Sequence, residues 1–258
     1  MLKAVRPVAI RLGQSFVAVF LVGTLDSRPA AAERPGADAL TRRPGTVVPS
    51  RRTDPHFLQR HKQMLLRKSA GPIDVLFLGD SITKRWDRDL WHARFGKWHP
   101  ANFGVDGDRT QHVLWRITEG GELEGVRPRL IVLLIGVNNV SYDPAEDIVA
   151  GITAIVAELR QRLPMSRVLL LGVFPVGAGP NVYRDRLKLV NVLISQLADG
   201  KMVRFLDFGK RFLEPDRSLS KDIMPDLLHL SPKGYAIFAD AVEPVITEML
   251  DQGTSGGR

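Results

Sequence analysis

The sequence predicts a single three-layer α/β/α domain, in which five parallel strands form a sheet covered by helices on both faces. Five short apolar runs recur along the chain, helical periodicity fills the segments between them, and glycine or polar residues directly follow several of the runs. Such alternation is typical of parallel sheets, whose buried strands read as near-continuous apolar stretches. The predicted strands cover residues 73–78, 100–105, 130–135, 167–173 and 203–207.

The first 32 residues have the tripartite pattern of a secretory signal peptide. Basic residues precede an apolar stretch at 15–25, and three alanines at 30–32 supply small residues for cleavage. That apolar stretch is well short of the roughly 20 residues that cross a bilayer as a helix. We therefore expect a cleavable signal and a secreted or periplasmic protein, with an uncleaved membrane anchor as the alternative.

Composition excludes several kinds of chemistry. The chain of 258 residues is 44% hydrophobic and 25% charged, as is usual for globular proteins, and contains no cysteine. Disulfides, thiolate nucleophiles and thiolate metal sites are therefore excluded. The formal charge of +8 falls to +5 without residues 1–32. The remaining basic residues form no stripe with interleaved aromatics, so we expect no nucleic-acid partner.

Changes in composition predict the domain boundaries. Residues 33–52 are rich in Pro, Gly, Ala and Arg without periodicity, which predicts a disordered lead-in. Thr53-Asp54-Pro55 is typical of a helix start, since proline is tolerated in the first turn. We expect the domain to cover residues 53–251 and a flexible tail to cover residues 252–258.

Three further helices follow from apolar positions that share one face. One begins at Pro144, and a second includes Leu187 and Ile194. The last begins at Ser231-Pro232, where serine is a favoured N-cap. Pro244 lies inside this last helix, and we expect it to kink or split the helix because proline removes a backbone donor.

The candidate nucleophile is Ser81, at the end of the first predicted strand. It closes the tripeptide Gly79-Asp80-Ser81, which is also ordinary turn chemistry when it stands alone. In open α/β sheets, however, binding sites lie outside the carboxyl ends of the strands.

Candidate partners follow the later strands. Gly104 ends the second strand, where glycine lets the backbone turn sharply. Asn138 follows the third strand, where a side-chain amide can donate to an oxyanion. Asp226 precedes His229 by three residues, a spacing that lets the carboxylate bind Nδ1 and leave Nε2 free as a base.

The Gly-Asp-Ser tripeptide and the candidate partners after the later strands follow one another in the order seen in the SGNH, or GDSL-type, hydrolase family. The chain therefore resembles that family. The resemblance runs from about Leu65 to Leu250 and is strongest to the catalytic subunits of intracellular platelet-activating-factor acetylhydrolase, over residues 102–139 and 226–244. It implies flavodoxin-like strand order 2-1-3-4-5. It also implies a serine esterase that cleaves short acyl groups, acetyl above all, without metal or cofactor. The resembled enzymes are dimers, which makes a homodimer an expectation.

By this resemblance, Ser81 is the nucleophile, His229 the general base and Asp226 its orienting partner. The N–H groups of Ser81 and Gly104 and the amide of Asn138 are then the oxyanion hole. Ile82 and Leu228 flank the nucleophile and the base, and we expect them to wall a small acyl pocket.

Two positions depart from the family pattern. Many members have aspartate after the asparagine that matches Asn138, whereas this chain has Asn139 there, as the acetylhydrolase-like subgroup has asparagine. Asp106 stands where that subgroup usually has glycine, so an extra carboxylate is expected to narrow or charge the pocket.

Several functions remain as alternatives to the esterase. An O-acetyltransferase would keep the same residues and pass the acyl group to a sugar hydroxyl. A longer-chain lipase or thioesterase would differ in the acyl pocket, and a carbohydrate-binding protein would keep the fold without turnover. The export pattern favours small-molecule or polysaccharide esters outside the cell as substrates.

Overall fold

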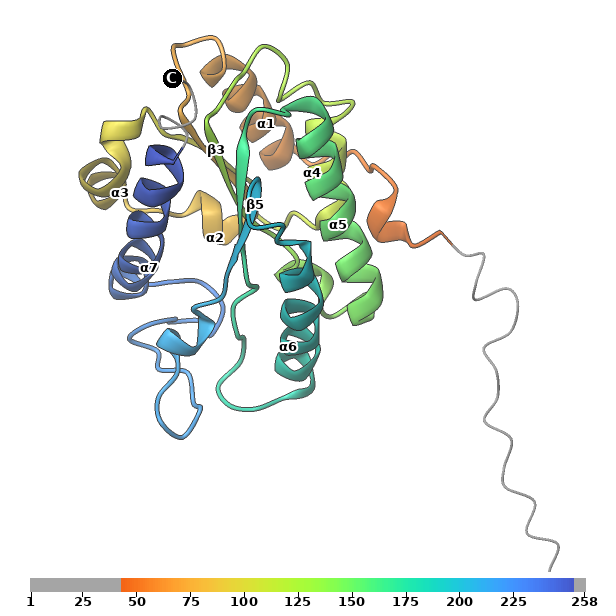
Figure 1. The fold of residues 1–258 in the computed structure, drawn as a ribbon. Helices are drawn as coiled ribbons and strands as arrows, with labels where there is room; N and C mark the ends of the chain where they lie inside the picture. The colour runs from red at the N-terminus through yellow and green to blue at the C-terminus, as the bar shows by residue number, and fades with distance from the viewer. Residues whose placement is uncertain (1–42, 253–258) are drawn as a thin grey trace, which may run out of the picture. The chain divides into compact units, whose positions relative to one another are not determined.

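The computed structural model describes residues 43–252, and the predicted signal peptide at 1–32 lies outside the described residues. A five-stranded parallel sheet forms the middle layer, in the order β2-β1-β3-β4-β5 (Figure 1). Both the five strands and the order implied by the resemblance are confirmed. The strands are β1 (Val75–Gly79), β2 (Ala101–Gly104), β3 (Leu130–Leu134), β4 (Arg167–Leu171) and β5 (Val203–Leu206).

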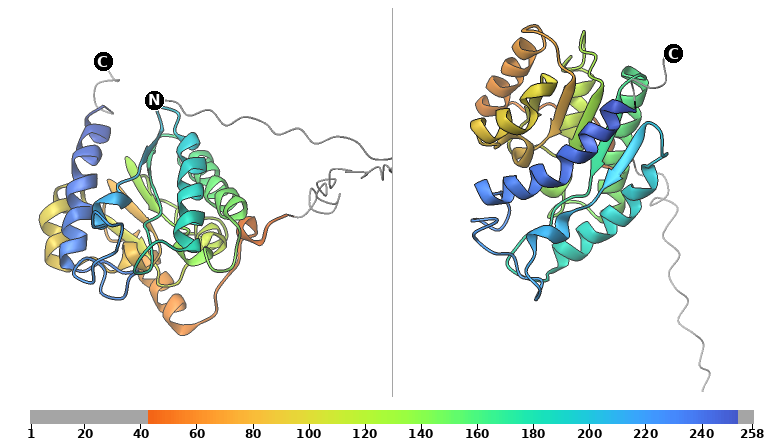
Figure 2. Two further views of the ribbon diagram at one scale, coloured as in Figure 1. Left: turned by 90° about the horizontal axis from the view of Figure 1, so that it is seen from below. Right: turned by 60° about the vertical axis from the view of Figure 1, so that its left-hand side comes forward.

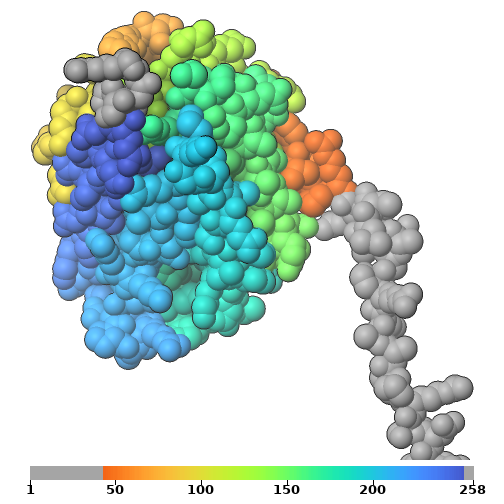
Figure 3. All heavy atoms as spheres, in the orientation of Figure 1, coloured from red at the N-terminus to blue at the C-terminus, as the bar shows by residue number. Residues whose placement is uncertain are grey.

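Helices cover both faces of the sheet. On one face α4, α5 and α6 lie side by side, and on the other α3 packs against α7 (Figures 1 and 2). Much of the surface seen in Figure 3 belongs to the last third of the chain. The helices are α1 (Pro55–Arg67), α2 (Ser81–Lys84), α3 (Arg88–Phe95), α4 (Thr110–Ile117), α5 (Ala145–Arg162), α6 (Val182–Ile194) and α7 (Pro232–Asp251).

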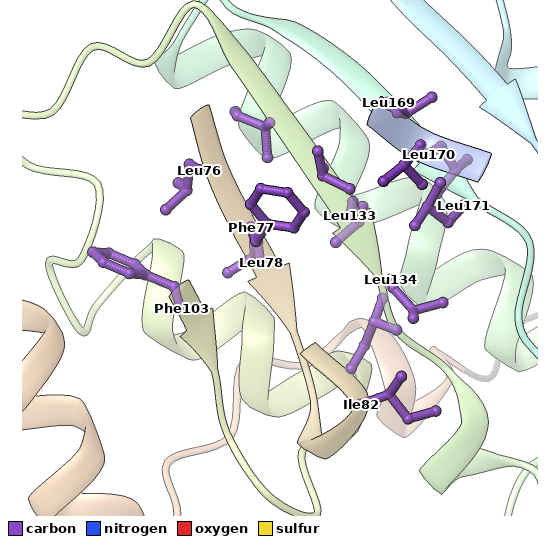
Figure 4. Close-up of a cluster of buried hydrophobic side chains, with 14 of the residues drawn as sticks. Leu76, Phe77, Leu78, Ile82, Phe103, Leu133, Leu134, Leu169, Leu170 and Leu171 are labelled. Atoms are coloured by element: carbon purple, nitrogen blue, oxygen red, sulfur yellow. The ribbon is translucent and has the colours of Figure 1, made fainter. Parts of the chain in front are cut away.

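The apolar runs form the core because both faces of each central strand are buried. Every residue of β1 and of β3 is buried. Figure 4 shows Leu78, Leu133 and Leu170, which lie at neighbouring register positions of three adjacent strands. Within residues 43–252, no helix has the length and apolar content needed to cross a membrane.

Polar caps start the helices where the sequence indicates. The side chain of Asp54 accepts the N–H of Phe57 at the start of α1. Ser231 accepts the N–H of Gly234 at the start of α7, directly before the proline at the first helical position.

Of the two effects expected at Pro244, a kink or a split, the split does not occur, because α7 continues through this residue to Asp251. Proline cannot donate a hydrogen bond to the preceding turn. The packing of Val242 and Ile246, both completely buried, holds the helix in place on either side of the proline.

The predicted disordered lead-in is also wrong for residues 43–52. Thr46 is completely buried, and its hydroxyl donates to the carbonyl of Asp147 at 2.6 Å. The N–H of Ser50 donates to the carbonyl of Gln111 at 3.0 Å. These long-range contacts give the aperiodic residues 43–52 a fixed path on the domain.

Candidate active site

Ser81 lies at the junction of β1 and α2, where the chain leaves the sheet. Asp80 caps α2, and its Oδ1 accepts the N–H of Ile82 at 2.9 Å. The turn requires glycine at position 79, since a Cβ there would lie 2.2 Å from the carbonyl oxygen of Leu134. Ser81 therefore projects from a tightly packed strand end.

Burial changes the ionisation of Asp80. Its side chain is completely buried, and no described residue forms a hydrogen bond with Oδ2. This burial raises the pKa of Asp80 to about 7, although the N–H of Ile82 acts to lower it.

The structure brings Ser81, His229 and Asp226 together. The Oγ atom of Ser81 lies 2.8 Å from Nε2 of His229. On the other side of the imidazole, Nδ1 lies 2.6 Å from Oδ2 of Asp226. This relay requires the tautomer in which Nδ1 carries the proton and donates to the carboxylate, so that Nε2 can accept the proton of Ser81.

The loop between β5 and α7 shapes this relay. Oδ1 of Asp226 accepts the N–H groups of Leu228 and His229, at 3.1 and 2.7 Å. Leu227, which follows Asp226 directly, has φ 63°, a left-handed conformation that is uncommon for residues other than glycine. Although partial burial acts to raise the pKa of Asp226, hydrogen bonds from the ring and backbone of His229 lower it to about 2.

Gly104 lies beside Gly79 in the register of β1 and β2, so the ends of these strands are adjacent. A Cβ at Gly104 would lie 2.3 Å from the backbone N of Lys84, which explains the need for glycine. The N–H of Gly104 donates to Oδ1 of Asn102 at 3.0 Å. The expected oxyanion donor is therefore already engaged in this structure, and an oxyanion would have to share or replace that bond.

Asn138 and Asn139 follow β3 and have different surroundings. Nδ2 of Asn138 donates to the carbonyl of Asp108 at 2.9 Å, which uses one of its two amide hydrogens. Asn139 is completely buried, accepts the N–H of Thr110 and donates to Asp143. Asn138 thus keeps a second amide hydrogen for a ligand. Asn139 instead connects the loop after β3 to the start of α4.

A completely buried arginine supports these strand ends. Arg116 donates to the carbonyls of Gly79 and Phe103, at 3.1 and 3.0 Å. Its Nη1 also forms a 2.8 Å ion pair with Glu122. Its Nε lies 2.8 Å from Oδ2 of Asp108, without the alignment of a hydrogen bond.

An open pocket of about 630 Å³ adjoins the site. Asn138 and Leu228 are among the residues that line it. Ile82 does not: it is 1% exposed and packs in the core, so the structure contradicts its expected place in the pocket wall (Figure 4). Asp106 is also absent from the lining, because its carboxylate pairs with Lys84 and Arg85.

Sequence reasoning missed the basic residues that hold the site. Arg60 donates to the carbonyl of Gly104 at 2.9 Å, and Arg52 donates to Oδ1 of Asp108 at 3.0 Å. For Arg116 there was a signal, since a charge interrupts the apolar residues of α4. No local pattern distinguishes Arg52, which lies in the aperiodic segment.

Comparison with known proteins agrees with this geometry. The model of the GDSL-like lipase/acylhydrolase family matches residues 77–237. The alpha1 subunit of platelet-activating factor acetylhydrolase IB from Bos taurus is 36% identical over 215 residues, which cover 82% of this chain and 92% of that protein. The alpha2 subunit from Rattus norvegicus is 35% identical over 201 residues, or 77% and 87% of the two chains.

A solved structure shares the fold at low identity. A putative acylhydrolase from Bacteroides fragilis superposes with a TM-score of 0.65 at 19% identity, over 77% of this chain and 100% of that one.

Proposed function

The chain belongs to the GDSL-like lipase/acylhydrolase family and is a carboxylic ester hydrolase, and from this premise we propose that it cleaves short-chain esters, acetyl esters above all, through an acyl-enzyme formed on Ser81. The observation that carries the proposal is the contact of 2.8 Å between Ser81 Oγ and His229 Nε2. The bovine relative is an acetylhydrolase by name, which supports the acetyl preference.

In the first half of the proposed reaction, the Oγ of Ser81 attacks the ester carbonyl while Nε2 of His229 takes its proton. Asp226 holds the ring and stabilises the imidazolium. The tetrahedral intermediate then collapses, the bond to the alcohol oxygen breaks, and His229 returns its proton to the departing alcohol. In the second half, His229 deprotonates a water molecule that attacks the acyl-enzyme. This step releases the acid and restores Ser81.

Three donors are proposed to hold the negative charge that develops on the carbonyl oxygen. The N–H of Ser81 lies in the first turn of α2, where N–H groups have no partner within the helix. Asn138 has a free amide hydrogen, and the N–H of Gly104 lies at the adjacent strand end. Donors placed in advance stabilise an oxyanion without reorganisation at the moment of reaction.

We also propose that the protein is exported. The proposal rests on the tripartite pattern of residues 1–32. An exported enzyme would find its ester substrates outside the cell, among them acetylated polysaccharides.

A panel of p-nitrophenyl esters from acetate to longer acyl chains tests the acyl preference, with Ser81→Ala as the matched variant. The expected result is a maximum of kcat/KM at acetate. For Ser81→Ala, kcat should fall about 10⁴–10⁶-fold, as when other serine nucleophiles are removed. Preference for eight carbons or more would reject the short-acyl proposal, and undiminished turnover by Ser81→Ala would reject the nucleophile.

A further inference from the structure

The pocket beside Asn138 and Leu228 contains cationic and aromatic side chains but no carboxylate. Two arginines, Arg52 and Arg109, contribute to its lining. Its volume of about 630 Å³ is in the range that holds small-molecule ligands and is far larger than an acetyl group requires. The pocket therefore has room for the alcohol part of an ester.

The two arginines differ in how their charge is balanced. Arg52 forms ion pairs with Asp54 and Asp108, at 2.9 and 3.0 Å. Arg109 is half-buried, and within residues 43–252 its guanidinium forms neither a hydrogen bond nor an ion pair. Its only side-chain partner in that range is the ring of Tyr142, whose centroid lies 4.9 Å from Cζ.

The histidine of the pocket adds no charge at neutral pH. Burial lowers the pKa of His112 to about 4, and the nearby charge of Arg109 acts in the same direction. Its Nδ1 accepts the backbone N–H of Arg109 at 3.0 Å, which fixes the ring beside this arginine. Arg109 therefore supplies the uncompensated charge in the lining.

Two tyrosines face solvent at the same pocket. Tyr142 is 74% exposed and Tyr183 is 41% exposed, both high values for large aromatic residues. Arg186 of α6 donates to the carbonyls of Val140 and Asp143, so the loop that carries Tyr142 is tied to the helix that carries Tyr183. The two rings thus lie on connected elements and offer apolar faces to a ligand.

We propose that Arg109 binds a carboxylate on the alcohol part of the ester, and that the substrates are acetyl esters of acidic sugars. The planar guanidinium can donate two parallel hydrogen bonds from its edge to a carboxylate while its face stays against Tyr142. The apolar face of a sugar ring packs against the tyrosines. This inference rests on the proposed esterase function.

The position of the pocket favours the alcohol rather than the acyl group. His229 must deliver its proton to the departing alcohol oxygen, so that oxygen lies on the histidine side of the reacting carbon. Leu228, the residue before His229, lines the pocket, as does the oxyanion candidate Asn138. An alcohol leaving past His229 therefore enters the space that leads to Arg109.

The test compares two matched substrates, a monoacetylated methyl glucuronoside and its neutral amide, by measuring acetate release. For Arg109→Gln, we expect kcat/KM to fall about 10–100-fold for the carboxylate and to stay within about twofold for the amide. This is the net loss of one charge-assisted hydrogen bond of the two, since the glutamine amide can still donate one. Arg109→Lys keeps the charge without the planar fork, so its loss should be intermediate. Arg88→Gln, which removes an exposed charge from α3 outside this pocket, should change neither substrate.

Each other outcome overturns the proposal in a recognisable way. Equal losses on both substrates, with unchanged thermal unfolding, would make Arg109 a structural residue. Unchanged kinetics would leave it without a role in binding. A loss confined to an acetylated methyl glucoside 6-phosphate would reject the carboxylate in favour of a phosphate. If wild-type enzyme hydrolysed p-nitrophenyl acetate but not the sugar esters, only this inference would fail, whereas no turnover of any ester would remove the proposed function itself.

Discussion

The guanidinium of Arg116, completely buried, donates a hydrogen bond of 3.1 Å to the carbonyl oxygen of Gly79, two residues before the proposed nucleophile. The same side chain also holds the carbonyl of Phe103, which precedes Gly104. One arginine therefore ties together the ends of the two strands that carry Ser81 and Gly104.

Replacing Arg116 with methionine should destabilise the protein strongly. It would leave the buried Glu122 without its arginine partner and with only His61 in contact, and breaking a buried pair typically costs about 3–5 kcal/mol. Urea unfolding measures the loss. Arg94→Met is the matched control, since Arg94 pairs with Asp240 and Glu243 near the surface and such pairs are worth about 0–1 kcal/mol. Equal losses in the two variants would contradict the role given to Arg116.

Substitution of the two adjacent asparagines should have different effects, one on catalysis and the other on stability. Asn138→Ala removes a proposed oxyanion donor and should lower kcat by about 10²–10³-fold, with a small effect on unfolding. Asn139→Ala leaves the buried N–H of Thr110 without its acceptor and should cost about 1–3 kcal/mol of stability. Kinetics with p-nitrophenyl acetate and urea unfolding distinguish them, and full activity in Asn138→Ala would refute its assignment.

Asp226→Asn should lower kcat by about 10²–10⁴-fold, because the amide can donate a hydrogen bond to Nδ1 and so favour the wrong tautomer of His229. We expect a decrease in kcat at the lower end of this range, because the Asp226 side chain is 56% exposed and water can partly replace it. Asp222→Asn changes an exposed carboxylate of the same loop outside the relay and serves as the control. Equal kcat values for Asp226→Asn and the control would remove Asp226 from the mechanism.

The pH dependence of stability should reveal Asp80. Its pKa of about 7 in the folded protein lies above the ordinary value of 3.8, so the folded state keeps a proton that the unfolded state loses. The resulting contribution to stability is complete below pH 3.8 and is lost as the pH rises towards 7. Asp80→Asn remains neutral and can still cap α2. Its stability relative to wild type should therefore increase between pH 4 and 7 and level off above, as followed by urea unfolding. A difference that does not change with pH would contradict the raised pKa.

Local sequence patterns predicted most of the fold. Each apolar run lies within two residues of a strand at either end, because a parallel strand buried on both faces must be apolar throughout. The strand order came from the family resemblance, since periodicity does not reveal which strands are neighbours. At Pro244 the local rule left a kink and a split open, and only the structure shows that α7 is continuous there.

The part of the candidate site that consists of short sequence motifs was predictable. Ser81, Asp226 and His229 lie where the motif spacing places them. Ile82 was misplaced because the direction of its side chain depends on how α2 turns back onto the core, which the sequence does not show. Arg52 was missed for a similar reason, since its partner Asp108 lies 56 residues further along the chain.

Ser81 and His229 are separated by 148 positions. Under the proposed mechanism, the chain must therefore be synthesised past His229 before any ester is cleaved, and turnover reports synthesis to that point. Division of the chain at the exposed residue Gly200 would place the hydroxyl and the imidazole on different fragments, neither of them competent. The hydrolysis rate recovered after mixing the two fragments would then measure the fraction of reassembled protein.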